Sequence, residues 1–271
     1  MLAGCATDRP AQTATPPTVP GNTAPPDASA VHQRLQALLP ADVLLLGEQH
    51  DDPAHQPLQR AVVQALAAQG TLAAVALEMA EQGATTAALA PDATEAQAQV
   101  ALRWDAAAWP WATYGPVVMA AVRAGVPVLG ANLPRTQIGD AMKSIALDDH
   151  LTMGSWQKQQ ENIREGHCGL LPAHQIVPMT RVQLARDAAM ARTVLAARQP
   201  GKTVLLVAGN AHVDRALGVP THLEPGIVSK AVRLGATDRA HPASADAVWT
   251  TPAPPPKDDC AELQRQMAPG R

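Results

Sequence analysis

Short apolar runs alternate along the chain with longer segments whose apolar residues recur at helical spacing. The short runs are apolar at nearly every position, which is typical of strands buried on both faces of a parallel sheet. They lie at residues 43–46, 72–77, 126–129, 203–207 and 227–234. Because strands that alternate with helices form parallel sheets, the pattern predicts an α/β fold with a mostly parallel β-sheet covered by helices on both faces.

The segments between these runs have the lengths and patterns of helices. A helix expected at 54–69 is followed by Gly70, and a second at 115–124 is followed by Gly125; glycine commonly follows the last turn of a helix. An Ala-rich region up to Leu102 is also expected to be helical. Residues 134–198 form a helical insertion, which Pro172 and Pro178 are expected to interrupt.

The two ends of the chain are rich in proline and small polar residues. Such segments bury too little apolar surface to offset the entropy of ordering, so we expect a flexible tether at 6–30 and a disordered tail at 250–271. One α/β domain over 31–249 remains. The chain has no Phe and one Tyr, so its core must consist of Ala, Val and Leu. The net charge of -3 disfavours nucleic-acid binding.

The first five residues end in Leu2-Ala3-Gly4-Cys5, which resembles the lipobox of bacterial lipoproteins, whose cysteine carries the lipid. The segment before it is shorter than the apolar stretch of ~7–15 residues in a secretory signal. We expect lipidation at Cys5, with the protein anchored in the cell envelope. Ala6 after the cysteine favours the outer membrane, facing the periplasm or the surface. The alternative is a chance run of small residues. A disulfide between Cys168 and Cys260 is open, since their spacing does not argue for one.

Polar residues of functional type follow four of the predicted strands. In open α/β sheets the functional crevice lies outside the carboxyl ends of the strands, so we expect these residues to converge there. They are Glu48, His50, Glu78, Asn132, Asn210 and His212. Gly47 and Gly209 precede two of them and are expected to let the backbone turn sharply where a ligand approaches.

Two interpretations of this set are open. His50, His212, Glu48 and Glu78 could hold a divalent metal that activates water, with Glu48 or Glu78 as the general base of a hydrolase. Alternatively, they line a pocket whose main ligand binds elsewhere. The spacing does not decide between these interpretations, because no HExxH helix fixes the geometry.

Two Gly-x-x-His motifs, ending at His50 and His212, resemble the signature of the superfamily that joins the ChaN haem-binding lipoproteins, the Tiki metalloproteases and the erythromycin-esterase-like proteins. Glu78 lies between the motifs. The resemblance is to the ChaN branch and covers about 42–234. Its other segments are Ala131-Asn132-Leu133-Pro134-Arg135, His167-Cys168-Gly169-Leu170-Leu171-Pro172, and Ala185-Arg186-Asp187-Ala188-Ala189-Met190-Ala191.

The resemblance implies a haem-binding, iron-regulated lipoprotein that acts beside a haem-uptake system and forms a homodimer. It places the haem ligand at Tyr114, since phenolate suits ferric iron. Trp111 is expected to cover the porphyrin and Arg135 to receive a propionate. The alternatives are ordinary packing for the aromatic residues and a surface position for Arg135. His55 faces either the crevice or solvent, and His167 with Cys168 forms either a ligand pair or a helix-end turn.

The sequence therefore predicts a membrane-anchored haem-binding lipoprotein in iron acquisition, with a metal-dependent hydrolase as the alternative.

Overall fold

The computed structural model describes residues 27–235, 244–254 and 256–267. These residues form a six-stranded sheet in the order β3-β2-β4-β1-β5-β6, and all of its strand pairings are parallel. The strands are β1 (Val43–Glu48), β2 (Leu72–Glu81), β3 (Val128–Asn132), β4 (Thr203–Gly209), β5 (Ser229–Gly235) and β6 (Ala247–Thr250). The predicted α/β class is confirmed. The short edge strand β6 was not predicted.

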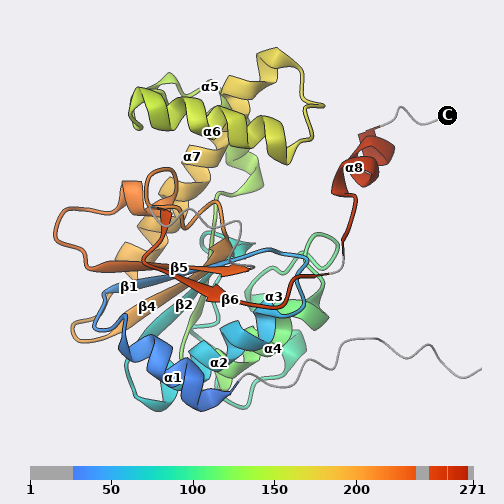
Figure 1. The fold of residues 1–271 in the computed structure, drawn as a ribbon. Coiled ribbons are helices and arrows are strands. Elements are labelled where there is room, and N and C mark those ends of the chain that lie inside the picture. Colours follow the sequence, from blue (N-terminus) through green and yellow to red (C-terminus); the bar gives the residue numbers. More distant parts are fainter. Residues whose placement is uncertain (1–26, 236–243, 255, 268–271) are drawn as a thin grey trace, which may run out of the picture.

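Helices cover both faces of the sheet (Figure 1). One face carries α1 (Ala28–Gln36), α2 (His55–Ala68), α3 (Glu95–Ala101) and α4 (Trp111–Arg123). The long helix α7 (Ala173–Ala196) packs on the other face. The insertion before it contains η1 (Arg135–Gln137), α5 (Ile138–Lys143), η2 (Ile145–Leu147) and α6 (Met153–Gly166). A short turn, η3 (Val219–His222), follows β4.

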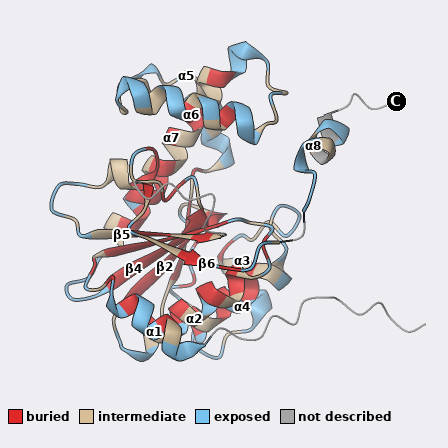
Figure 2. Ribbon diagram, viewed as in Figure 1, coloured by how far each residue is buried: buried red, intermediate tan, exposed pale blue. Residues whose placement is uncertain are grey.

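Each central strand is buried on both faces (Figure 2). Alternate residues of β1 supply two separate cores, because successive side chains of a strand point to opposite faces. Leu44 and Leu46 pack with α2 and α4, whereas Val43 and Leu45 pack with α7. Burial on both sides explains why the strands read as continuous apolar runs.

Two helix expectations were wrong. Pro178 does not interrupt α7, which runs through it; the carbonyl that proline leaves without a partner belongs to the exposed His174, where water can reach it. Of the Ala-rich region before Leu102, only α3 is helical. Thr94 starts that helix with a capping box, and the chain before it turns at Gly83, whose φ is +90°.

Both predicted ends contain regular structure. Helix α1 begins inside the predicted tether because Asp27 accepts a hydrogen bond from Ser29 N at 2.9 Å, while Val31 and Leu35 are buried. Helix α8 (Asp259–Met267) lies inside the predicted tail, and a disulfide joins its Cys260 to Cys168. The tether up to residue 26, with Cys5, lies outside the described residues.

Candidate functional site

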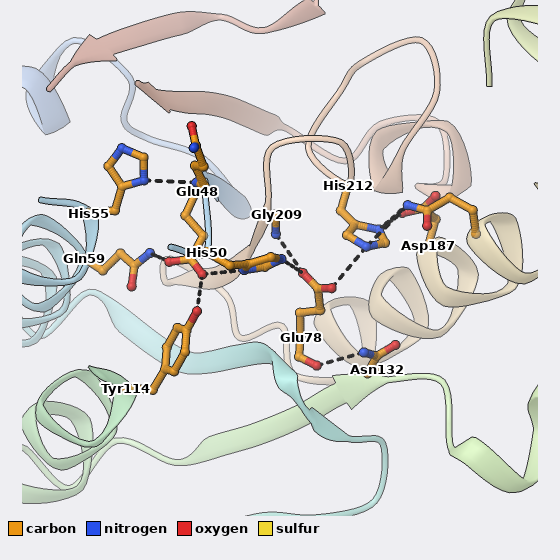
Figure 3. Close-up of polar contacts among 12 residues, drawn as sticks. Glu48, His50, His55, Gln59, Glu78, Tyr114, Asn132, Asp187, Gly209 and His212 are labelled. Atoms are coloured by element: carbon orange, nitrogen blue, oxygen red, sulfur yellow. Dashed lines mark hydrogen bonds and ion pairs between the residues drawn. The ribbon is translucent and has the colours of Figure 1, made fainter. Parts of the chain in front are cut away.

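Four of the predicted residues meet at the carboxyl edge of the sheet (Figure 3). His50 Nδ1 lies 2.7 Å from Glu48 Oε1, and His50 Nε2 lies 3.7 Å from Glu78 Oε2. His212 Nε2 lies 3.3 Å from Glu78 Oε1. Glu48 ends β1, Glu78 lies near the end of β2, and His50 and His212 follow β1 and β4. Carboxylate and imidazole therefore alternate along this series of contacts.

A further residue extends this series at each end. The Tyr114 hydroxyl on α4 donates to Glu48 Oε1 at 2.7 Å. On α7, Asp187 Oδ1 lies 2.6 Å from His212 Nδ1. We call the six residues Tyr114, Glu48, His50, Glu78, His212 and Asp187 the polar chain. It crosses the sheet edge from one helical layer to the other, and all of its members except His50 are buried.

Charges alternate strongly in the buried half of the polar chain. Burial alone would lower the pKa of His212, but Glu78 and Asp187 raise it to about 10, so the imidazole is a cation. Burial raises the pKa of Glu78, but the His212 and His50 charges outweigh this and hold it at about 2. Burial raises the pKa of Asp187 to about 6 despite His212. A buried cation thus lies between two carboxyl groups.

Glu48 is the most heavily hydrogen-bonded carboxylate of the polar chain. Besides Tyr114 and His50, it accepts from Gln59 Nε2 and, at 3.3 Å, from Gln56 Nε2. Both glutamines lie on the buried side of α2. Gln59 and Asp187 are not among the residues predicted from the sequence. The one feature that could have indicated them is that each is a polar residue on the mostly apolar, buried side of its helix, α2 or α7.

The two asparagines of the predicted set hold backbone instead of joining the polar chain. Asn132 Nδ2 donates to the Glu78 carbonyl at 2.9 Å, and Asn210 Nδ2 donates to the Leu234 carbonyl at 2.9 Å. Asn132 thereby contacts the adjacent strand β2, whereas Asn210 contacts β5, which lies beyond β1 in the strand order.

Gly47 and Gly209 are required by close approach and not by a turn. A Cβ on Gly47 would lie 2.5 Å from Val213 Cγ2 and 2.6 Å from Asn210 Oδ1. A Cβ on Gly209 would lie 2.9 Å from His50 Nε2. Neither glycine has a positive φ. The missing side chains let the His50 ring and the loop after β4 lie against the strand ends.

A groove with a volume of about 1180 Å³ runs between α2 and α4, and we call it the α2–α4 groove. Most of its lining residues are Ala, Pro and Gln. Three of the lining residues have ring side chains: Trp109, Tyr114 and His50. The ring centroid of Trp109 lies 4.9 Å from that of His50 and 5.7 Å from that of Tyr114. The Tyr114 end of the polar chain therefore borders an apolar groove.

Several predicted site residues lie elsewhere. Trp111 does not line the groove; its Nε1 donates to Glu95 Oε2 at 2.9 Å. Arg135 is 69% exposed and pairs with Asp105 at 2.6 Å. His55 is fully buried, where its Nδ1 accepts from the Gln49 amide at 3.0 Å.

His167 and Cys168 form a helix-end turn. His167 follows the last residue of α6, and its Nδ1 lies 2.7 Å from the Ile163 carbonyl. Cys168 has a φ of 54° and is bonded to Cys260. The ligand alternative for this pair is therefore not supported by the geometry, since both side chains are engaged.

Within the described ranges, no group of three or more His, Cys, Asp or Glu residues is arranged to hold a metal ion. The four predicted ligands pair with one another instead.

The protein is an α/β protein with an open parallel sheet. It has a polar chain at the carboxyl edge of that sheet and an apolar groove beside it. The family described as "Haem-binding uptake, Tiki superfamily, ChaN" matches residues 34–223, so the chain belongs to that family. A solved structure described as "Cofacial heme binding to ChaN of Campylobacter jejuni" is also similar, with a TM-score of 0.67 and 25% identity over 80% of this chain and 89% of that one. No curated protein sequence matches the chain.

Proposed function

We propose that the protein binds haem in the α2–α4 groove and takes part in haem acquisition. The observation that carries the proposal is the groove itself, whose apolar walls end at an oxygen donor, Tyr114, and a nitrogen donor, His50. Apolar clefts with a few convergent polar groups are the usual sites for flat cofactors. The family and the Campylobacter jejuni neighbour, both described by haem binding, support the same assignment.

The groove offers donor chemistry that suits haem. Tyr114 is proposed as the ligand of ferric iron, for which phenolate oxygen is a suitable donor. Burial and the nearby Glu48 raise the pKa of Tyr114, so the isolated phenol keeps its proton. Ligation therefore requires the hydroxyl to leave its bond with Glu48, and Glu48 lies where it can accept the proton. Trp109, and not Trp111, lies where it can cover the ring.

Titration with hemin tests this proposal. The wild-type chain is expected to shift the Soret band, while Tyr114→Phe, which keeps the ring and loses the donor, should bind at least about tenfold more weakly because one iron ligand is lost. His50→Ala is the matched comparison, since His50 borders the same groove. If His50→Ala abolishes the ligation spectrum and Tyr114→Phe does not, the Tyr114 assignment is wrong. If no protein shifts the band, haem binding is refuted.

We further propose that the chain is a lipoprotein, anchored through Cys5 in the outer membrane. Disulfides persist in oxidising compartments such as the periplasm, and the Cys168–Cys260 bond supports an envelope location. No helix in the described part of the chain is long and apolar enough to cross a membrane. Labelled fatty acid should be incorporated into the wild-type protein and not into Cys5→Ser. If Cys5→Ser still incorporates the label, lipidation at this cysteine is contradicted.

A homodimer and a haem-uptake partner complete the proposed role. The Campylobacter jejuni neighbour is described by cofacial haem, an arrangement in which two rings lie face to face. An open groove leaves one face of a bound ring uncovered, so a second copy of the chain could supply the other side. Analytical sedimentation with and without hemin measures the oligomeric state. A protein that stays monomeric in both conditions would exclude the dimer.

A metal-dependent hydrolase is the second candidate, and one observation favours it. The Nε2 atoms of His50 and His212 face the two oxygens of the same carboxylate, Glu78, at 3.7 and 3.3 Å. Small shifts would turn this arrangement into a two-histidine, one-carboxylate site with Glu48 nearby. Metal analysis of the purified protein decides this question. Absence of bound Mn, Co, Zn or Fe, together with no gain of hydrolytic activity when they are added, would reject it.

A further inference from the structure

Helix α2 lines the α2–α4 groove with a single stripe of its surface. The lining positions recur every three or four residues, which places them on one face of the helix. They are Gln56, Pro57, Arg60, Ala61, Gln64 and Ala65. Every member of this stripe except Arg60 is uncharged. One permanently charged group therefore faces an otherwise apolar or neutral helical wall.

The Arg60 guanidinium has no hydrogen bond or ion pair to any described residue. Arg135 and Arg181, by contrast, are both paired: Arg135 lies 2.6 Å from Asp105, and Arg181 lies 2.6 Å from Asp148. Arg60 is exposed and borders the groove, so its five N–H donors are available to a ligand there. An unpaired guanidinium beside an apolar cleft is a typical anchor for a planar carboxylate or phosphate.

The position of Arg60 along α2 relates it to the donors at the end of the groove. Gln56 Nε2 donates to Glu48, the carboxylate that also holds Tyr114. Arg60 lies one helical turn further along, about 6 Å by the rise of the helix. A ligand centred near Tyr114 would therefore reach Arg60 with groups at its edge. A tetrapyrrole carries its carboxylates at the edge of the ring.

We propose that Arg60 binds a carboxylate of the tetrapyrrole held in the α2–α4 groove. This inference rests on the proposed function, because it assigns a contact within the same groove. Arg60 takes the role that the sequence analysis gave to Arg135, whose guanidinium is already paired and lies outside the groove lining. The subsite makes the groove selective for tetrapyrroles with ionised carboxylates over their neutral esters.

Binding of hemin and of hemin dimethyl ester, at one fixed detergent concentration, tests the contact. The proteins are the wild type, Arg60→Gln, and the control Arg123→Gln, which removes the same charge from an exposed position on α4 outside the groove lining. Arg60→Gln should weaken hemin binding about three- to tenfold, as expected for a charge-assisted pair that is partly exposed. Arg123→Gln should change it less than twofold. For the dimethyl ester, Arg60→Gln should equal the wild type.

The outcomes separate this inference from the proposed function. If wild-type protein binds neither ligand, the proposed function fails. If it binds hemin and Arg60→Gln binds hemin as tightly as Arg123→Gln does, the Arg60 contact is wrong and haem binding stands. If Arg60→Gln weakens the dimethyl ester as much as hemin, Arg60 acts by packing, and the carboxylate contact is overturned. Thermal melts of both variants check that the fold is kept.

Discussion

Replacement of His212 with Gln should lower the free energy of unfolding by about 3–5 kcal/mol, because it removes the cation between two buried carboxyl groups. Glu78 Oε1 lies 3.3 Å from His212 Nε2, and Asp187 Oδ1 lies 2.6 Å from His212 Nδ1. Both carboxyl groups would remain buried without a positive partner. Urea unfolding followed by circular dichroism at pH 7 measures the loss. The exposed His32→Gln is the control and should change stability by less than about 0.5 kcal/mol.

The same histidine should give the wild type a stability that falls at alkaline pH. Glu78 and Asp187 raise the pKa of His212 from 6.5 to about 10 against the effect of burial. A raised histidine pKa stabilises the fold fully below pH 6.5, and this contribution is lost as the pH rises toward 10. Within that window each pH unit removes up to ~1.4 kcal/mol. His212→Gln should have a clearly smaller slope between pH 7 and 9. An unchanged slope would mean that His212 is neutral in the folded protein.

Replacement of Glu48 with Ala should cost about 3–5 kcal/mol, since the donors that converge on it would lose their acceptor inside the protein. Tyr114, Gln59 and Gln56 all donate to this side chain, which is fully buried. Glu48→Gln keeps the shape and one acceptor oxygen, so it should cost less, about 1–3 kcal/mol.

Chemical denaturation of both Glu48 variants tests this ranking. Glu161→Ala is the control, because Glu161 is exposed and forms a surface pair with Lys158 at 3.2 Å, which contributes at most about 1 kcal/mol. Equal stability of Glu48→Ala and the wild type would show that the polar chain adds nothing to the fold. Equal losses for Ala and Gln would show that the charge, and not the number of acceptors, is what matters.

The sheet was predictable because its signal is local. The strands β1, β2 and β4 appear as uninterrupted apolar runs, since burial on both faces demands it. The edge strand β6 was missed because it is only four residues long and half exposed. Helix α8 was missed because a Pro-rich segment precedes it. The disulfide to Cys168 was left open because the two cysteines are 92 residues apart in sequence.

The candidate site was predictable in part for the same reason. Parallel strands end at one edge of a sheet, so residues at or just beyond the ends of β1, β2 and β4 must lie near one another, and Glu48, His50, Glu78 and His212 do. The partners on the helices were not predictable. Asp187 on α7 and Gln59 on α2 face the strand ends only because each helix packs at a particular rotation on the sheet.

The sequence by itself determined the α/β class, the alternation of the longer strands with helices, and the gathering of acidic and histidine side chains at one edge, since these follow from residue patterns repeated along the chain. Only the tertiary structure decided which partner each of those side chains has. It directs the Tyr114 hydroxyl to Glu48, places Trp109 in the groove in place of Trp111, and leaves Arg60 unpaired there while Arg135 is bound to Asp105. These outcomes depend on contacts between elements far apart in the sequence, and their geometry is set by packing. The polar edge formed by the strand ends is thus also one end of a groove that no local pattern of residues indicates.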